Sequence, residues 1–202
     1  MTTEDTALAP AGSTPEAPAA DTRSRLLAAA REVICEVGLK PARMEDIAAR
    51  AGVSRAAVYY HFNTKGDLAT AIFDDVLLRL TIAVRAALAD GPLDGVIDAT
   101  VRFFADQAAL GRLLITDMGL PADPAQFFAR HRDVLLGLLR RRIAADIAAG
   151  RVRSMDPDVA ARAVLGLMRV APVELICNEA ADQNHLTTEL SEFLRQAIAP
   201  TP

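Results

Sequence analysis

The sequence predicts an all-α protein in which an amino-terminal three-helix domain precedes a larger helical domain. Three observations lead to this fold class. Aromatic residues make up only 4% of the 202 residues, whereas Ala and Leu are plentiful, and this composition favours helices over strands. Apolar residues recur at steps of three and four through most of the chain, as on one face of a helix. No segment has the convincing alternation of a strand, and no internal repeat is present.

The first twenty residues differ in composition from the rest of the chain. They contain six Ala, four Thr and three Pro, and their only large apolar side chains are Met1 and Leu8. Such a segment buries too little apolar surface to offset the entropy that ordering would remove. We therefore expect a disordered tail over 1–20, the small domain over 21–66 and the larger domain over 67–202.

The first helix of the small domain is predicted where apolar residues recur at helical spacing from Leu26 to Val37. Asp21 or Thr22 can cap its amino terminus, since both side chains accept hydrogen bonds from free backbone N–H groups. Gly38 is placed to end the helix in the left-handed conformation.

Two shorter helices, Met44–Ala51 and Ser54–His61, are predicted on either side of a tight turn. Gly52 can adopt the positive φ that this turn requires, and Ser54 is an N-cap residue type. The apolar residues of this region are spaced to face one another and the first helix; they are Ile47, Ala48, Val53 and Val58. This pattern is typical of a helix-turn-helix, whose second helix lies in the major groove of DNA.

A long helix begins at Thr64-Lys-Gly-Asp67, which has the form of a capping box. Beyond it, turn residues divide the chain into further helical patterns, with a short separate element before Pro121. We expect these helices at about 93–109, 125–149, 157–181 and 186–198.

Charge and cysteine content narrow the functional classes. The net charge is −4, but residues 21–73 carry +2, so the positive charge lies in the predicted helix-turn-helix domain. Cys35 and Cys177 lack the spacing of a zinc site or disulfide scaffold, and we expect both to be small buried residues, with no metal and no cofactor. No stretch is long and apolar enough to span a membrane, and the amino terminus lacks a signal-peptide pattern. These features indicate a cytoplasmic protein without a membrane partner.

Over roughly residues 22–73 the sequence resembles the tetracycline-repressor-like (TetR) family of bacterial regulators. The residues that carry the resemblance are Asp46-Ile-Ala, Ala51-Gly-Val-Ser54, Val58-Tyr59, His61-Phe62, Lys65 and Leu68. The chain departs from the family where Ala42 and Arg43 replace frequent Thr residues, where Ala56 replaces a frequent Gly, and where Gly66 replaces an acidic residue. The missing hydroxyl shifts one expected phosphate contact to Arg43 itself.

The resemblance implies DNA-contacting roles for residues of the two short helices. Arg55 is expected to reach guanine O6 and N7, and the small Ala56 and Ala57 allow close approach to the bases. Tyr59 has packing as its alternative role, and His61 is alternatively an interface histidine. The predicted DNA-binding residues are Arg43, Met44, Ser54, Arg55, Ala56, Ala57, Tyr59, Tyr60, His61 and Lys65.

The resemblance also implies that residues 67–202 form a dimeric body with a ligand cavity. The candidate cavity residues suit an apolar ligand with one hydrogen-bonding group; they are Phe103, Phe104, Met118, Phe127, His131 and Met168. Ordinary core packing is the alternative for each, and His131 is alternatively a surface residue. We interpret the Arg140–Arg142 run as a solvated face or an ion-pair partner of Asp146, and not as a second DNA site.

For the homodimer interface we expect the last two helices to contribute apolar surface. The candidate residues are Leu175, Leu190, Phe193 and Leu194, with the core of one chain as the alternative for each.

The sequence therefore predicts a DNA-binding transcriptional regulator, a repressor released from a palindromic double-stranded operator by a small, largely apolar effector. The alternative is a regulator that activates, or that responds to a protein partner without a small-molecule pocket. An enzyme is not expected, because no histidine stands in a nucleophile motif and the adjacent Asp74 and Asp75 point apart on a helix.

Overall fold

The computed structural model describes residues 19–118, 124–178 and 180–200, and every regular element in these ranges is a helix. This confirms the all-α prediction. A small head is built from α1 (Ala19–Val37), α2 (Met44–Ala51) and α3 (Arg55–His61). The long helix α4 (Lys65–Asp90) leads into a larger body, which is completed by α5 (Gly95–Met118), α6 (Pro124–Ala148), α7 (Pro157–Met168), α8 (Val170–Cys177) and α9 (Gln183–Ile198).

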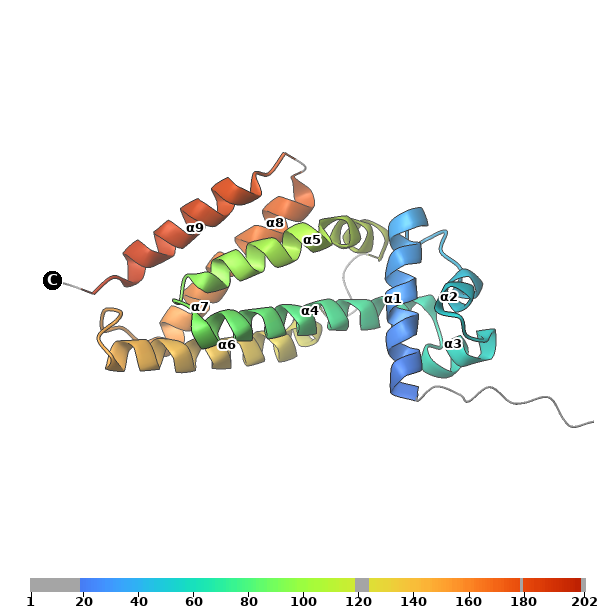
Figure 1. Cartoon of the computed structure of the whole chain (residues 1–202), viewed down its shortest axis with the longest axis horizontal. Helices are drawn as coiled ribbons and strands as arrows, with labels where there is room; N and C mark the ends of the chain where they lie inside the picture. The colour runs from blue at the N-terminus through green and yellow to red at the C-terminus, as the bar shows by residue number, and fades with distance from the viewer. Residues whose placement is uncertain (1–18, 119–123, 179, 201–202) are drawn as a thin grey trace, which may run out of the picture.

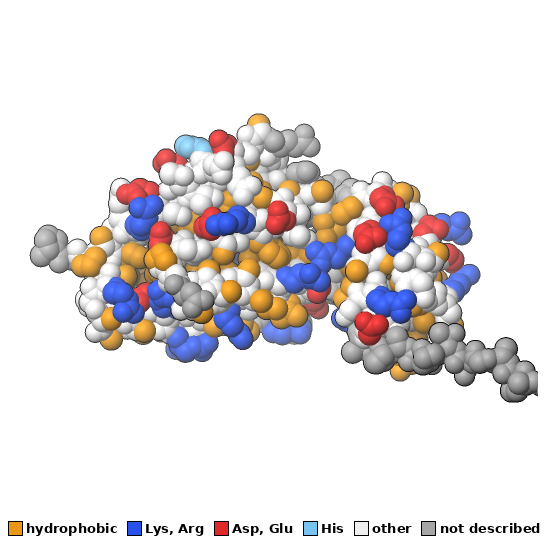
Figure 2. Space-filling view, viewed as in Figure 1, with side chains coloured by type: hydrophobic (Ala, Val, Ile, Leu, Met, Phe, Trp, Pro, Cys, Tyr) orange, Lys and Arg blue, Asp and Glu red, His pale blue; other side chains and the backbone are white. Residues whose placement is uncertain are grey.

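The head lies at one end of an elongated body (Figure 1). In this view α1 stands across the end of α4, and α2 and α3 lie on the side of α1 that faces away from the body. Hydrophobic side chains gather along the visible face of the body, and Lys and Arg side chains follow its lower edge (Figure 2).

The helix ends in the head follow local signals in the sequence. Gly38 has φ 86° just beyond α1, and Ser54 and Thr64 cap α3 and α4, with the complete capping box present at Thr64. The start of α1 differs from the prediction: the helix already includes Ala19, so Asp21 lies in its first turn and does not cap it. Of the predicted tail, residues 1–18 lie outside the described residues.

Two helices of the body also differ from the prediction. Helical periodicity continues beyond residue 109, and α5 runs to Met118, so residues 110–118 are part of this helix and not of a separate short element. The expected helix over 157–181 is divided at Arg169 into α7 and α8. Pro172 explains this break, because in a continuous helix its ring would meet the carbonyl of Met168, whereas in the first turn of α8 its missing N–H is harmless.

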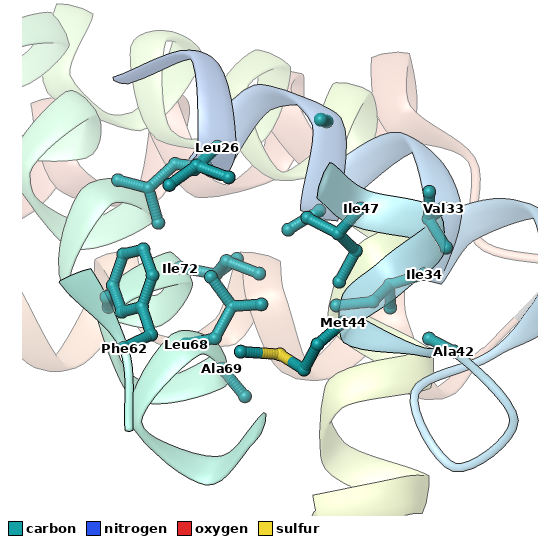
Figure 3. Packing of buried hydrophobic residues seen from close by; sticks show 14 of the residues in the cluster. Leu26, Val33, Ile34, Ala42, Met44, Ile47, Phe62, Leu68, Ala69 and Ile72 are labelled. Atoms are coloured by element: carbon teal, nitrogen blue, oxygen red, sulfur yellow. The ribbon is translucent and has the colours of Figure 1, made fainter. Parts of the chain in front are cut away.

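Two hydrophobic clusters hold the fold together. In the head, Leu26, Ile34 and Ile47 point toward Leu68 and Ile72 of α4 (Figure 3), so α4 belongs to the core of the head as well as to the body. The second cluster packs α4 to α9 around Val84, Ile97, Leu139 and other buried side chains. Because α4 contributes side chains to both clusters, this helix joins the head to the body.

A buried ionic cluster closes the far end of the body. The Asp146 carboxylate accepts hydrogen bonds from Arg142 at 2.9 Å and from Arg151 at 2.5 Å. Arg142 also donates to the carbonyls of Leu88 and Gly91 at the end of α4. The interpretation of Arg142 as an ion-pair partner of Asp146 is therefore confirmed, and the cluster satisfies the otherwise free carbonyls at a helix carboxyl terminus.

The expectation of two buried cysteines was wrong, since both thiols are free and exposed in this chain. The Cys35 position lies on the solvent side of α1, next to Glu36. Partial desolvation nevertheless raises the pKa of the Cys35 thiol, and the charge of Arg31 opposes this shift. Across the described ranges no helix is both long and apolar enough to cross a membrane.

Candidate nucleic-acid interface and ligand cavity

The turn between α2 and α3 is held in place from both sides. Gly52 has φ 64°, a left-handed conformation that a side chain would strain, and its N–H bonds back to α2. Nη2 of Arg25 on α1 donates to the carbonyls of Ala51 at 2.6 Å and Gly52 at 3.2 Å. The turn therefore has a fixed orientation on α1, and with it the direction of α3.

One face of α3 is buried and the opposite face is open to solvent. Val58 is fully buried in the head core, whereas Arg55, Ala56, Tyr59 and Tyr60 are exposed. Ser54 Oγ accepts a hydrogen bond from the Ala57 N–H at 3.1 Å, which leaves the first turn of α3 ordered and accessible. This exposed face has the small residues and the cation that a helix in a major groove requires.

A single carboxylate organises the charges beside this face. Glu45 Oε1 lies 3.0 Å from Arg55 Nη2, and Glu45 Oε2 lies 3.8 Å from Arg43 Nε. Glu45 therefore holds both arginines beside the exposed face of α3. The Arg55 guanidinium also stacks over the Tyr59 ring at 5.5 Å. All three pairings lie at the surface, where an incoming phosphate or base can replace them.

The remaining predicted contacts divide into exposed and buried ones. Tyr60 is 82% exposed and meets the half-buried His61 ring edge-on at 5.2 Å. Tyr59 is only 40% exposed, and its ring packs against the Arg55 guanidinium. The side chain therefore has a packing role and is still partly accessible from solvent. The Met44 side chain is buried in the head core, which leaves only its backbone N–H for a contact with DNA.

Lys65 has a structural partner that the sequence did not reveal. Its ammonium donates to the carbonyls of Lys40 at 2.6 Å and Ala42 at 3.2 Å, and so fixes the loop between α1 and α2 on the start of α4. An ammonium has three N–H donors, so one is left for a phosphate.

The outer surface of the head carries a second charge network. Arg50 on α2 bonds Glu36 at 2.7 Å and Glu32 at 3.1 Å on α1. The hydrogen bond from Arg50 lowers the pKa of the Glu36 carboxyl. Arg50 therefore joins α2 to α1, away from the exposed face of α3.

The body encloses a cavity of about 280 Å³ between α4, α5, α6, α7 and α8. Most of its wall is apolar and includes Phe73, Leu77, Phe104, Leu135, Met168 and Ile176. Its polar residues are Thr100, Gln107, His131, Arg132 and Arg169. The cavity is thus an apolar chamber with a few polar groups, as ligand sites commonly are.

Three of the six predicted cavity residues line this chamber: Phe104, His131 and Met168. Phe103 instead packs between the two hydrophobic clusters, with its ring edge-on to Phe104 at 5.4 Å, so its alternative role in the core applies. The side chains of Met118 and Phe127 lie outside the described residues. The imidazole of His131 is mostly buried, and its Nε2 lies 3.2 Å from Asp74 Oδ1 on α4, so it is not a surface residue.

A short chain of contacts connects this cavity with the head. The cavity residue Gln107 accepts a hydrogen bond through Oε1 from Nη2 of Arg31 on α1 at 2.5 Å. Nη1 of Arg31 donates to Asp75 on α4 at 2.8 Å. The Arg31 side chain is largely buried, so one guanidinium joins head, long helix and cavity wall. Sequence reasoning missed both Arg31 and Gln107, because they are 76 positions apart.

The predicted dimer residues divide in a similar way. Leu175 and Leu194 are buried in the core of this chain and present no surface to a partner, and Leu190 packs partly against that core. Phe193 is 64% exposed, and Val173 on α8 is also exposed. The large apolar side chains that α8 and α9 expose are therefore Val173 and Phe193, and not the buried leucines.

Comparison with known proteins finds matches in the same region of the chain. Residues 26–72 match the model of a family described as bacterial regulatory proteins, tetR family. The HTH-type transcriptional regulator CymR of Pseudomonas putida is 37% identical over 93 residues, which are 44% of this chain and 46% of CymR. The HTH-type transcriptional repressor BepR of Brucella suis is 38% identical over 82 residues, covering 38% of this chain and 37% of BepR.

These matches span less than half of each curated relative. Over the whole fold, the structure of a TetR/AcrR-family transcriptional regulator from Thermobifida fusca superposes with a TM-score of 0.66 at 20% identity, covering 86% of this chain and 96% of that one. At this identity the likeness concerns the fold alone. CymR and BepR are both named as transcriptional regulators, which agrees with the prediction that the chain is not an enzyme.

Proposed function

We propose that this chain, which carries the DNA-binding domain of the TetR family, acts as a cytoplasmic, homodimeric repressor released from a roughly palindromic operator by a small, largely apolar effector. The observation that carries the proposal is the open face of α3, where Arg55, Ala56, Tyr59 and Tyr60 are exposed on a helix oriented by Gly52 and Arg25. A helix-turn-helix presents this face to base edges in the major groove.

In the proposed complex, sequence is read by the amino-terminal turn of α3. Arg55 exchanges Glu45 for guanine O6 and N7, while Ala56 and Ala57 meet base methyl groups. Arg43, Tyr60, His61 and the third N–H of Lys65 contact the phosphate backbone, as do backbone N–H groups at Met44 and Ser54. These backbone contacts set the register of the head on the duplex.

Dimerisation through α8 and α9 would supply the second reading head. Phe193 and Val173 offer exposed apolar side chains on these helices, and burying them removes unfavourable contact with water. An interface of this kind has two-fold symmetry, so its operator has two related half-sites.

Control by an effector is supported by the cavity and its connection to the head. A ligand that displaces or rotates the Gln107 amide removes an acceptor from Arg31, and so loosens the hold of α4 and α5 on α1. Release follows only if the ligand binds the released arrangement more tightly than the DNA-bound one, and operator DNA then weakens ligand binding by the same factor.

Repression is the proposed direction of control because BepR, which is 38% identical over 82 residues, is named a repressor. Activation is the second candidate, because FasR of Mycolicibacterium smegmatis, which is 41% identical over 71 residues, is named an activator. A cavity in the body favours a small-molecule effector over the alternative of a protein partner without a pocket.

The first test is binding of the purified dimer to the DNA upstream of its own gene, measured by anisotropy at several salt concentrations. We expect sequence-specific binding that weakens steeply with salt. If the protein does not bind that DNA, selection from a pool of random duplexes identifies candidate operators. A chain that selects no sequence while remaining dimeric would contradict the proposal.

A further inference from the structure

The ligand cavity has a charged rim that a purely apolar effector would leave unused. Arg132 on α6 and Arg169 at the junction of α7 and α8 both line the cavity, and both side chains are exposed. They therefore stand where the apolar chamber meets solvent.

The charge at this rim is not balanced by the cavity itself. Within the described residues, no Asp or Glu lines the chamber. Arg132 has an exposed ion pair with the adjacent Asp133 at 2.9 Å, whereas Arg169 has no carboxylate partner in the described part of the chain. His131, which also lines the chamber, faces Asp74, with its Nε2 3.2 Å from Asp74 Oδ1. The rim is therefore positive overall.

The interior offers few free hydrogen-bonding groups. The Thr100 hydroxyl donates to the Val96 carbonyl at 2.6 Å, and the Gln107 carbonyl oxygen is occupied by Arg31. Phe104, Leu135 and Met168 make up much of the remaining wall. This surface suits a hydrocarbon chain, while the rim suits a negative charge.

We propose that the cavity binds an amphiphile with an anionic head, namely a carboxylate on a hydrocarbon chain. Arg132 and Arg169 hold the carboxylate at the rim, and the chain lies in the apolar interior. Guanidinium groups match carboxylates in geometry and charge, and exchange of the Asp133 pair for the ligand requires only surface rearrangement. This inference deepens the proposed function by naming the chemical class of the effector.

The test compares three ligands that differ only in the head group: decanoate, decan-1-ol and decylamine. Binding to the full-length protein without DNA is measured by isothermal titration calorimetry, below the concentration at which micelles form. We expect decanoate to bind about tenfold more tightly than decan-1-ol, which corresponds to one charge-assisted contact. Decylamine should bind more weakly than the alcohol. The advantage of decanoate should shrink as salt rises, because the arginines are exposed.

Variants locate the effect at the rim. The double variant Arg132→Gln/Arg169→Gln should bind decanoate and decan-1-ol equally, with the affinity for the alcohol unchanged. Arg162→Gln is the matched control, since Arg162 is an exposed arginine on α7 that does not line the cavity. Equal binding of decanoate and decan-1-ol to the wild type, a preference that survives in the double variant, or no binding of any of the three would overturn the inference.

The operator experiment separates this inference from the proposed function. If decanoate binds as expected but the protein selects no DNA sequence, the cavity assignment stands and the regulator does not. If the operator is bound but the three ligands behave alike, the regulator stands and its effector belongs to another chemical class.

Discussion

The head and the body of this protein form their sites in opposite ways. The DNA-facing surface comes from residues within the short stretch 43–65. Its local shape is set by caps and a glycine turn in that stretch, and Arg25 of α1 fixes its orientation. The cavity is lined by side chains of five helices, from Phe73 on α4 to Ile176 on α8. A local site keeps its geometry wherever the motif folds, whereas the distributed site exists only when five helices pack correctly.

The difference extends to the polar contacts that stabilise each part. In the head, Ser54 and Thr64 accept hydrogen bonds from N–H groups three residues away, and Arg25 and Lys65 reach carbonyls 23 to 27 positions away. In the body, Arg142 reaches carbonyls more than fifty positions earlier and shares a buried carboxylate with Arg151. Removing a local cap exposes one amide to water, whereas removing the buried carboxylate leaves charges without a partner.

The largest effect is therefore expected in the body. Asp146→Ala should lower the free energy of unfolding by about 3 kcal/mol, because the Asp146 side chain is 3% exposed and two arginines depend on it. Chemical denaturation followed by circular dichroism measures this change. Asp98→Ala, which removes a surface pair with Arg102, is the control and should change stability little. Similar losses in the two variants would mean that the buried cluster is no more important than a surface pair.

The second largest effect concerns base reading by the head. Arg55→Ala should weaken operator binding by about tenfold to a hundredfold and relax the base preference, with little change on random DNA. Arg50→Ala is the matched control, because this arginine pairs with Glu32 and Glu36 on α1. Binding-site selection measures both variants, and an Arg55→Ala profile identical to the wild type would refute the assigned role.

The contrast between local and distributed sites explains which structural features could be predicted from the sequence. The turn at Gly52, the cap at Ser54 and the capping box at Thr64 are signals within four residues, so their structures were predictable. The same holds for Val58 as a buried residue of α3. Confined to one short segment, such signals do not depend on packing elsewhere.

Predictions for the body were less complete because they needed tertiary information. Phe103 and Phe104 are adjacent and equally apolar, and only the packing of α5 decides that Phe104 faces the cavity while Phe103 enters the core. Leu175 and Phe193 were equal candidates for the dimer interface, and only the packing of α8 and α9 decides that Leu175 is buried while Phe193 is exposed. One signal was overlooked: Pro172 in the expected helix over 157–181 was sufficient to predict the break near Arg169.

Coupling between the two parts provides the third prediction. Gln107→Leu keeps an apolar cavity wall but removes the acceptor for Arg31, so it should imitate a bound effector and weaken operator binding by about fivefold. Gln107→Glu retains an oxygen at this position and should bind the operator like the wild type. Anisotropy with the selected operator measures both variants. If Gln107→Leu binds as tightly as Gln107→Glu, Arg31 does not transmit the state of the cavity.

Lys65 lies where head and body meet, and its variant distinguishes a structural contact from a phosphate contact. Lys65→Met should weaken binding to all DNA sequences and reduce the slope of log affinity against log salt by about 0.9, as expected for one lost phosphate contact. Arg85→Met on the same helix is the control, because Arg85 is an exposed arginine on the part of α4 that lies in the body. An unaltered slope together with a lower melting temperature would assign Lys65 only to the loop at Lys40 and Ala42.

The smallest expected effect is a gain in DNA affinity. It tests whether a single charge within the DNA-facing surface influences binding. Glu45 faces both Arg55 and Arg43 on the DNA-facing surface, so its charge opposes that of the phosphates. Glu45→Gln should tighten operator binding by about threefold, a modest change because exposed pairs are weak and screened by salt. The gain should be largest at low salt and should appear on random DNA as well. Weaker operator binding by Glu45→Gln would instead show that Glu45 positions Arg55 for its base, so that the carboxylate contributes to recognition rather than opposing it.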